Sequence, residues 1–547
     1  MSFYKNHFAG KSGKRIIVIL LCCAIFFSCF PVSAEAGQLE EADTLAGETG
    51  PEGEILAPEG SYAYYLKTHE GVPFSDTEFV LDADEFTDTN QKLLVFKDYE
   101  GSGKSAVLTA EEGYVEWEFN VPGTGMYQIN MKYFGYGGKG SDIERILNID
   151  GKVPYDEANY ITFQRAWRDV YGFEEKDING NDICPGQEEV KKWLTADFKD
   201  SSGYYTEPFA FYLEEGKHTI RLTSVREPLM IESFTFHEEE TVKSYSEVKS
   251  EYDKAGYRTA SGDAVYIQAE ALYEKSEKSN YPLNDRSSSF TQPQEIDSII
   301  LNTLGGTKWQ KAGSTVTWKT KVGISGLYKI VPRFRQNVYS GVYVSRKLLI
   351  NGKLPFQEAG NLQFAYNDDW QCKPLGNESE DYLFYLEAGK EYEISLEVIL
   401  GDMGDVLRRV EDSVVSLNEI YRKILMITGA NPDKYRDYEF EKLIPGTLGD
   451  MKVQAAELES LVDKMTELTG KKCERAVQLE KLAYLVGRMV DNTDEIPGKF
   501  KYFKDNIAAL GTWILETAKQ PLELDYIALV PENRGSPKAN DGLHLSI

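Results

Sequence analysis

The sequence predicts a mainly β protein with an α insertion, built from two β-sandwiches of which a helical bundle interrupts the second. Three observations lead to this prediction. A block of alternating apolar residues occurs twice, a helical period dominates only one later region, and a strand-like segment follows that region. With 547 residues the chain is long enough for several domains that each bury a core.

The repeated block surrounds Trp117 in its first copy and Trp318 in its second. The two tryptophans lie 201 positions apart, and the same separation recurs between Gly151 and Gly352, so the copies align without a gap. Each copy alternates apolar and polar residues and ends in an Asp-Gly or Asn-Gly hairpin signal, which supplies the positive φ of a tight turn. Consecutive short strands joined in this way are typical of jelly-roll sandwiches.

The beginning of the chain has the composition of a targeting segment. Residues 1–36 combine a basic start, an apolar run and small residues, the pattern of a secretory signal peptide; an uncleaved anchor and a lipid on Cys29 are weaker alternatives. Residues 37–60 are rich in Glu, Gly, Ala and Pro and are expected to form a disordered spacer. We therefore expect a secreted protein, extracellular or at the cell surface, without a membrane span after signal cleavage.

The rest of the chain divides into consecutive parts. From residue 408 onward apolar residues recur at helical spacing, and breaks with Gly and Pro split them into four amphipathic helices. The segment Leu522–Leu529 then matches the final strand of the first sandwich, with Asp525 at the position of Glu232, so this strand is expected to return to the second sandwich. The predicted parts are the first sandwich (61–240), a linker (241–262), the second sandwich (263–407 and 520–531), the bundle (408–519) and a tail (532–547).

Composition excludes several classes of function. Removing residues 1–34, with four basic and no acidic residues, changes the formal charge from −28 to −32, so nucleic acid is not expected as a partner. Only five His are present and no H-E-x-x-H, G-x-S-x-G or P-loop motif occurs, which argues against histidine-based catalysis. The cysteines that remain after cleavage, Cys184, Cys372 and Cys473, give no disulfide framework.

The first sandwich carries an extra aromatic stretch, Phe163–Tyr205. The separation between equivalent positions falls from 201 to 173 residues beyond it, so the first sandwich has 28 more residues here. Sugar binding by a sandwich needs an exposed aromatic plane and polar groups for the hydroxyls; the alternative is that the rings close the end of the core. The candidate sugar-binding residues are Trp167, Asn181, Asp182, Trp193, Tyr204, Tyr205 and Arg226 in the first sandwich and Arg335, Asn337 and Trp370 in the second.

The opening Gln268-Ala269-Glu270, the core around Trp318 and the closing Leu524–Ile527 resemble carbohydrate-binding modules of the galactose-binding jelly-roll type, families six and thirty-five. The resemblance implies an oligosaccharide or polysaccharide ligand. It also implies a structural calcium ion, held by the Glu of Q-A-E and the acid of the last strand. The implied metal ligands are Glu270 and Asp525 in the second sandwich and Asp84 and Glu232 in the first; in a chain with 88 acidic residues, unrelated surface acids are the alternative.

Four further segments, Gly341–Arg346, Arg408–Val414, Ile427–Pro432 and Phe503–Trp513, are similar to the N-terminal half of large extracellular solute-binding proteins of sugar ABC transporters. The resemblance covers about residues 61–541 and implies a secreted, non-catalytic carbohydrate-binding protein. That family continues into a solute-binding domain which this sequence lacks. The protein is therefore expected to be the N-terminal part of such a protein or an accessory to it, with ABC transporter components as possible partners.

Two other classes of function stay open. A structural or adhesion spacer at the cell surface would use both sandwiches without a ligand. A glycoside-active enzyme would need a pair of carboxylates at a defined separation, which the sequence does not reveal.

Overall fold

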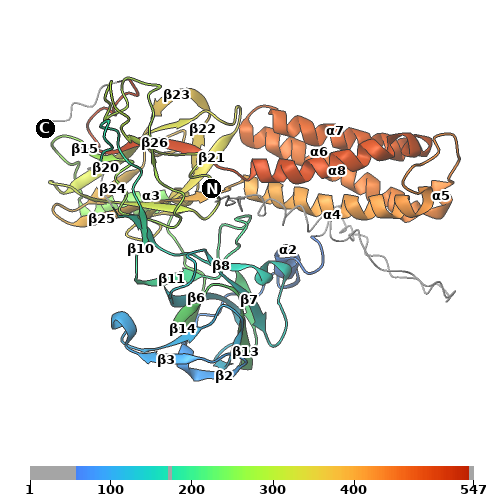
Figure 1. Cartoon of the computed structure of the whole chain (residues 1–547), viewed down its shortest axis with the longest axis horizontal. Helices are drawn as coiled ribbons and strands as arrows, with labels where there is room; N and C mark the ends of the chain where they lie inside the picture. The colour runs from blue at the N-terminus through green and yellow to red at the C-terminus, as the bar shows by residue number, and fades with distance from the viewer. Residues whose placement is uncertain (1–56, 171–174, 541–547) are drawn as a thin grey trace, which may run out of the picture. The chain divides into compact units, whose positions relative to one another are not determined.

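The computed structural model of the chain describes residues 57–170 and 175–540 (Figure 1). The predicted signal peptide and most of the predicted spacer lie outside these residues. The described part contains two β-sandwiches and a helical bundle, so the predicted fold class is confirmed.

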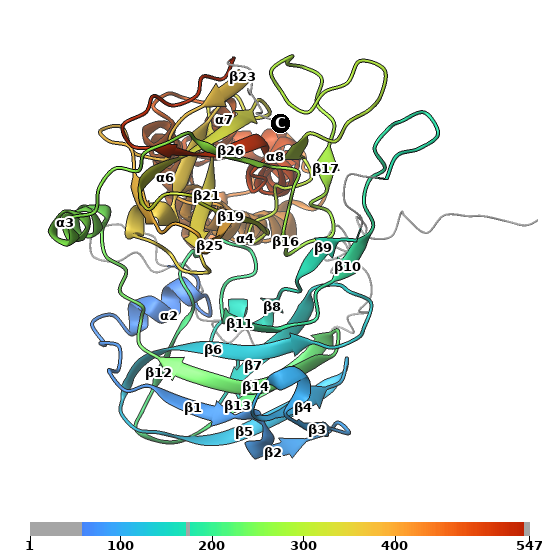
Figure 2. The ribbon, with the colours of Figure 1, turned by 90° about the vertical axis from the view of Figure 1, so that its left-hand side faces the viewer.

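Two antiparallel sheets form the first sandwich (Figure 2). Alternate residues of their strands point into a shared core, where the buried Trp117 donates its indole N–H to the carbonyl of Ala83 at 2.8 Å. The β6 sheet has the order β11 (Trp193–Asp197), β6 (Gly125–Gly135), β14 (Leu229–His237), β4 (Ser105–Thr109), β3 (Leu94–Lys97), with β1 (Phe79–Asp82) beside β14 and β12 (Ala210–Leu213) beside β6. The β5 sheet has the order β2 (Phe86–Thr89), β5 (Gly113–Val121), β13 (Gly216–Arg226), β7 (Ile143–Ile149), β8 (Ile161–Phe163).

The second sandwich repeats this plan, and Trp318 donates its indole N–H to the carbonyl of Ala269 at 3.0 Å. The β20 sheet has the order β17 (Pro282–Leu283), β18 (Thr303–Gly306), β26 (Leu522–Pro531), β20 (Gly326–Gln336), β23 (Asn367–Cys372), with β15 (Val265–Gln268) beside β26 and β24 (Leu383–Leu386) beside β20. The β19 sheet has the order β16 (Glu274–Lys275), β19 (Thr315–Lys321), β25 (Glu391–Ile399), β21 (Tyr343–Ile350), β22 (Leu362–Ala365). Two short strands of the first sandwich's extra stretch continue the β19 sheet beyond β16: β9 (Trp167–Asp169) and β10 (Gln187–Glu189).

The strand that follows the bundle lies inside the second sandwich. Strand β26 pairs with β20 on one side, from Tyr328 opposite Pro531 to Arg335 opposite Glu523, and with β18 on the other. Figure 1 shows β26, coloured red, beside β20. The prediction that the bundle is inserted into the second sandwich is therefore confirmed.

Four long helices form the bundle, as the sequence predicts: α4 (Met403–Thr428), α6 (Pro445–Thr469), α7 (Glu474–Asp491) and α8 (Ile496–Thr517), with a short α5 (Phe440–Leu443) before α6. Their apolar stripes meet in one buried core that is separate from the two sandwich cores. Gly429 and Gly470 end α4 and α6 with positive φ, and Pro445 begins α6 at a position that needs no N–H donor.

The predicted linker differs from the structure, because it contains the helix α3 (Tyr245–Ala255). Ser244 and Glu247 form a capping box at its start. Tyr245 is buried in the second core and its hydroxyl accepts the N–H of Leu383 at 2.9 Å. The first sandwich begins in the same way with α2 (Tyr62–Thr68), where the Tyr62 hydroxyl accepts the N–H of Ala210 at 2.8 Å. Only two residues of α3 are buried. Its sequence is therefore mostly charged and polar, which is typical of a linker.

Candidate functional site

Trp167 does not form an exposed platform for a sugar, contrary to the sequence hypothesis. It lies on β9, which pairs with β16 of the second sandwich, and only 6% of its surface is exposed. The Lys278 ammonium of the second sandwich lies 4.1 Å from the centre of its ring. The ring therefore stabilises the contact between the two sandwiches, because burying a large apolar side chain is favourable.

We expect Trp167→Ala to destabilise this contact rather than to remove a ligand site. Truncation of a buried Trp costs about 3–5 kcal/mol, so the melting temperature of the full chain should fall. Trp167→Phe keeps an apolar ring and is the matched control that should recover most of the loss. An unchanged melting temperature for Trp167→Ala would contradict the buried role.

Tyr204 and Tyr205 are also structural, which corrects their predicted role. The Asp200 carboxylate accepts the backbone N–H groups of Ser202, Tyr204 and Tyr205 and so fixes a tight turn. This turn sends Tyr205 into the first core, where its ring meets Tyr62 edge-on at 4.9 Å. It sends Tyr204 against the core of the bundle. Both rings are therefore half-buried against apolar cores instead of forming an exposed platform.

Asn181 and Asp182 bind protein backbone instead of a sugar. Asn181 Oδ1 accepts the N–H of Ile299 at 2.7 Å, and Asp182 Oδ2 accepts the N–H of Leu301 at 2.9 Å. Both partners belong to the loop 284–302 of the second sandwich. Arg226, at the end of β13 in the other sheet, forms an ion pair with Glu144. The residues predicted for the first sandwich are thus not brought together in one site.

Trp193 is the predicted residue that remains on an open sheet face. It lies on β11 and points away from the core of the first sandwich. Its indole N–H donates to the carbonyl of Tyr99 at 2.9 Å, and Phe134 packs edge-on against its half-buried ring at 5.5 Å. We call this surface the outer-face patch; its partly exposed members are Phe96, Tyr99, Leu108, Tyr136 and Trp193, which pack over the buried Ala106, Phe134 and Met230.

Polar groups border the outer-face patch. Lys132 Nζ lies 2.9 Å from Glu232 Oε1 and 5.7 Å from the centre of the Trp193 ring. About a third of the Lys132 side chain is exposed, whereas Glu232 is buried. At the other end of the patch, Leu108 and Tyr136 line a hollow of about 220 Å³. The face therefore offers apolar rings and charged hydrogen-bonding groups side by side, which is the arrangement that binds a sugar.

Trp193, Lys132 and Glu232 form a set of one tryptophan, one cation and one carboxylate. The second sandwich has such a set at equivalent strand positions. Arg333 replaces Lys132, because Arg333 pairs with Cys372 two residues after Trp370, as Lys132 pairs with Thr195 two residues after Trp193. Arg333 lies 4.7 Å from the Trp370 ring and forms an ion pair with Asp525, which takes the place of Glu232.

The repeated set of tryptophan, cation and carboxylate was not identified from the sequence, although the separation of its two cations was a signal for it. Lys132 and Arg333 are separated by the same 201 positions as the repeated block. Trp193 and Trp370 are 177 positions apart and Glu232 and Asp525 are 293 apart, because loops and the bundle intervene. No single offset aligns all three pairs.

Of the residues predicted for the second sandwich, Arg335 and Trp370 lie together. Arg335 lies 4.7 Å from the Trp370 ring, on the side of the β20 sheet that carries Arg333. Its guanidinium also binds Glu523 at 2.6 Å and Asp285 at 3.0 Å. Only 7% of Trp370 is exposed, because both guanidinium groups lie against its ring, and the loop 284–302 binds these groups in turn. Asn337 lies exposed just beyond the end of β20.

Glu270 and Asp525 fit a cation site. Both side chains are buried, and Glu270 Oε2 and Asp525 Oδ1 have no hydrogen-bond partner among the described residues. Burial, with a smaller effect of Asp525, raises the pKa of Glu270 to about 8. Burial raises the pKa of Asp525 to about 7 despite its ion pair with Arg333. Two orphaned carboxylate oxygens suit a hard cation such as calcium.

The remaining ligands of such a cation would be backbone carbonyls or water, since the described residues hold no cluster of three His, Cys, Asp or Glu side chains. The equivalent pair in the first sandwich does not fit. Asp84 is exposed, and both carboxylate oxygens of Glu232 have partners, Lys132 Nζ at 2.9 Å and Ser233 Oγ at 3.5 Å. Among the described residues this pair has no buried oxygen without a hydrogen-bond partner, so the first sandwich does not fit the predicted second calcium site.

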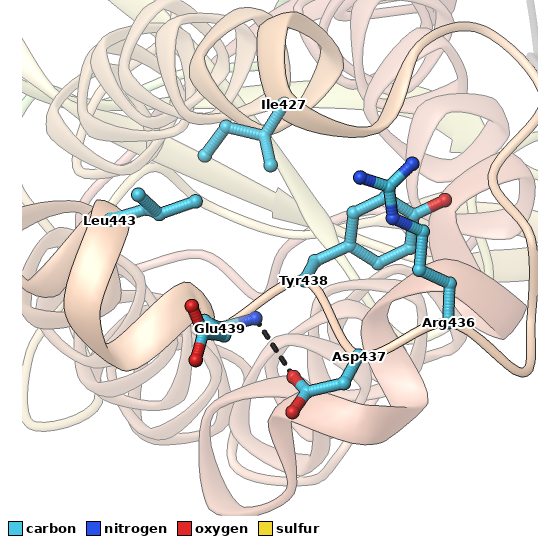
Figure 3. A pocket seen from close by; sticks show the side chains of 6 residues that line it. All are labelled: Ile427, Arg436, Asp437, Tyr438, Glu439 and Leu443. Carbon is cyan, nitrogen blue, oxygen red and sulfur yellow. Dashed lines mark hydrogen bonds between the residues drawn. The ribbon is translucent and has the colours of Figure 1, made fainter.

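A hollow of about 550 Å³ lies at the end of the bundle where α4 connects to α5 (Figure 3). Asp437 accepts the N–H of Glu439 at 2.8 Å, and the Arg436 guanidinium lies 5.0 Å from the Tyr438 ring. Its polar groups are thus engaged with one another, and none of the predicted site residues lines it. We assign it no ligand.

Comparison with known proteins supports the assignment of the bundle. Residues 405–514 match the family model of the bacterial solute-binding protein four-helix-bundle domain, so the resemblance predicted for the bundle is confirmed. A search of curated proteins finds no match. No helix within residues 57–170 and 175–540 is long and apolar enough to cross a membrane.

Several solved carbohydrate-binding modules are similar to about one sandwich of this chain. A family 35 module from Clostridium thermocellum is 15% identical, with 30% of this chain and 98% of the module covered and a TM-score of 0.20. The C-terminal family 6 module of a marine laminarinase from Zobellia galactanivorans is 12% identical, with 30% and 100% covered and a TM-score of 0.18. A family 35 module from Cellvibrio japonicus is 13% identical, with 30% and 95% covered and a TM-score of 0.18.

Proposed function

We propose that this is a non-catalytic carbohydrate-binding protein whose ligand site is the outer-face patch of the first sandwich. The observation that carries the proposal is the half-buried Trp193 ring on an open sheet face, flanked by further rings and by Lys132 and Glu232. The apolar face of a pyranose stacks on such a ring, while the ammonium and carboxylate bind its hydroxyls. The formal charge of −28 favours a neutral oligosaccharide or polysaccharide over a polyanion.

The bundle supports a role in sugar transport, and the start of the chain supports a location outside the cell. The bundle is of the kind found in bacterial solute-binding proteins, which supports a role as the N-terminal part of, or an accessory to, a solute-binding protein of a sugar ABC transporter. The signal-peptide pattern of residues 1–36 supports secretion to the cell exterior or cell surface. Within this proposal, calcium at Glu270 and Asp525 has a structural role in the second sandwich.

Calorimetric titration of the full chain with neutral oligosaccharides, chosen by a glycan array, tests the site. Trp193→Ala should weaken binding at least tenfold, about 1.4 kcal/mol, because the stacking surface is lost. Tyr484→Ala is the control, since it removes an aromatic ring that is 68% exposed on the bundle and should leave affinity unchanged. Equal affinity of Trp193→Ala and the unaltered chain would reject the outer-face patch as the site.

A structural spacer is the second candidate. It is favoured by the use of Trp167 and Tyr204 to fasten the first sandwich to its neighbours. If the full chain binds no glycan on the array, this candidate replaces the carbohydrate-binding proposal.

A further inference from the structure

The second sandwich closes the face that the first sandwich leaves open. In the first sandwich the seven residues 98–104 connect β3 to β4 beside the outer-face patch. In the second, the equivalent connection from β17 to β18 has 19 residues, the loop 284–302. This longer loop forms hydrogen bonds with Arg333 and Arg335, whose guanidinium groups each lie 4.7 Å from the Trp370 ring.

Hydroxyl groups of the loop bind both guanidinium groups of this face. Arg333 donates to Thr291 Oγ1 at 2.9 Å and to Ser288 Oγ at 3.1 Å. Arg335 donates to Ser287 Oγ at 2.5 Å. Hydroxyls are the groups that a sugar would present to the same arginines. The indole N–H of Trp370, by contrast, is buried and has no hydrogen-bond partner among the described residues. The loop therefore satisfies the arginines but leaves one donor of this face unused.

The loop is held in place from two sides. Within the loop, Asn302 binds the backbone of Asp285 in both directions, at 2.8 and 3.0 Å. From the first sandwich, Asn181 and Asp182 accept two of its backbone N–H groups and Asp182 donates its own N–H to the carbonyl of Ile299 at 2.8 Å. The first sandwich therefore contributes to keeping the second face covered.

We propose that the loop 284–302 is an internal ligand that occupies a second carbohydrate site, formed by Trp370, Arg333 and Arg335. Displacement of the loop opens this site to a neutral oligosaccharide, which stacks on Trp370 and exchanges its hydroxyls for those of Ser287, Ser288 and Thr291. The ligand class rests on the proposed function of the first sandwich. That the loop covers this face does not rest on the proposed function, since it follows from the contacts of the loop itself.

Replacement of residues 284–302 by the chain's own shorter connection, residues 98–104, tests the proposal in the full chain. All variants also carry Trp193→Ala, which removes carbohydrate binding by the outer-face patch. Glycan-array and calorimetric binding should be at least tenfold stronger with the short loop than with the native loop, and Trp370→Ala should return it to the native-loop level. A folded short-loop chain that binds no glycan overturns the proposal. So does Trp370-dependent binding with the native loop in place.

A milder variant covers the case in which the short-loop chain fails to fold. Asn181→Ala with Asp182→Ala removes only the two side chains that hold the loop from the first sandwich. Hydrogen exchange at the amides of Ile299 and Leu301 should become at least tenfold faster, and weak glycan binding should appear in the Trp193→Ala background. Unchanged exchange together with absent binding overturns the proposal.

The outcomes separate this proposal from that of the outer-face patch. Binding by the unaltered chain through Trp193, without any gain from loop replacement, contradicts only the internal ligand. Binding only after loop replacement contradicts only the first sandwich's site.

Discussion

Gly305→Ala is expected to prevent the second sandwich from closing around its returning strand. Gly305 has φ +107°, and a Cβ built there would lie 2.1 Å from the backbone carbonyl oxygen of Leu522, the first residue of β26. Neither backbone can retreat, because β18 pairs with β26 at this point and Leu522 is fully buried. The loss should exceed about 4 kcal/mol, which is exceptional for one methyl group. Thermal unfolding and limited proteolysis around residue 520 measure it.

Gly306→Ala is the matched control at the next position. Its φ of +57° strains any L-residue, but apart from the chain neighbours no heavy atom of the described residues lies within 4 Å of the added Cβ. The expected cost is therefore about 1–2 kcal/mol from the backbone conformation alone. If the two variants melt at the same temperature, the clash with β26 is not what makes Gly305 necessary.

The second large effect is expected at Glu270 and Asp525 when calcium is removed by a chelator. The folded-state pKa values are raised to about 8 and about 7, above the ordinary values of 4.5 and 3.8. The folded state thus binds more protons than the unfolded state between about pH 4 and pH 8. Its free energy of unfolding should fall by several kcal/mol across this window as pH rises, since each pKa unit corresponds to roughly 1.36 kcal/mol.

Excess calcium should abolish this fall, because the cation pairs with the ionised carboxylates and replaces the lost protons. Melting temperatures at pH 5 and pH 8, with calcium and with chelator, measure the effect. Glu270→Gln is the control: it keeps the shape of the side chain but should weaken both the pH dependence and the response to calcium. Equal melting with and without calcium at pH 8 would refute the cation site.

Much of the fold was predictable because its signals are local. The separation of 201 residues between Trp117 and Trp318 revealed two copies, and alternation against helical spacing separated strands from bundle. The returning strand was found from its match to the end of the first sandwich, and β26 confirms it. The helix α3 was missed, because only Tyr245 and Val248 of its residues are buried and its sequence otherwise resembles a charged linker.

The candidate site was less predictable, because aromatic residues within one stretch differ in whether the folded protein buries or exposes them. The aromatic stretch could be read from the sequence as a source of rings. Which ring stays partly exposed depends on contacts across the chain: Trp167 is covered by Lys278 of the second sandwich, whereas Trp193 lies half-buried on the outer face of its own sandwich. Sequence spacing does not encode which surfaces meet.

The sequence by itself determined the strand and helix periods, the two copies and the acids at equivalent positions of their last strands. Only the tertiary structure decided what those acids do. Glu232 faces the ammonium of Lys132, while one oxygen of Asp525, beside the buried Glu270, has no hydrogen-bond partner within residues 57–170 and 175–540. The difference arises because charge and hydrogen bonding are settled by neighbours brought together from distant strands, and a buried carboxylate must find such a neighbour, a proton or a cation.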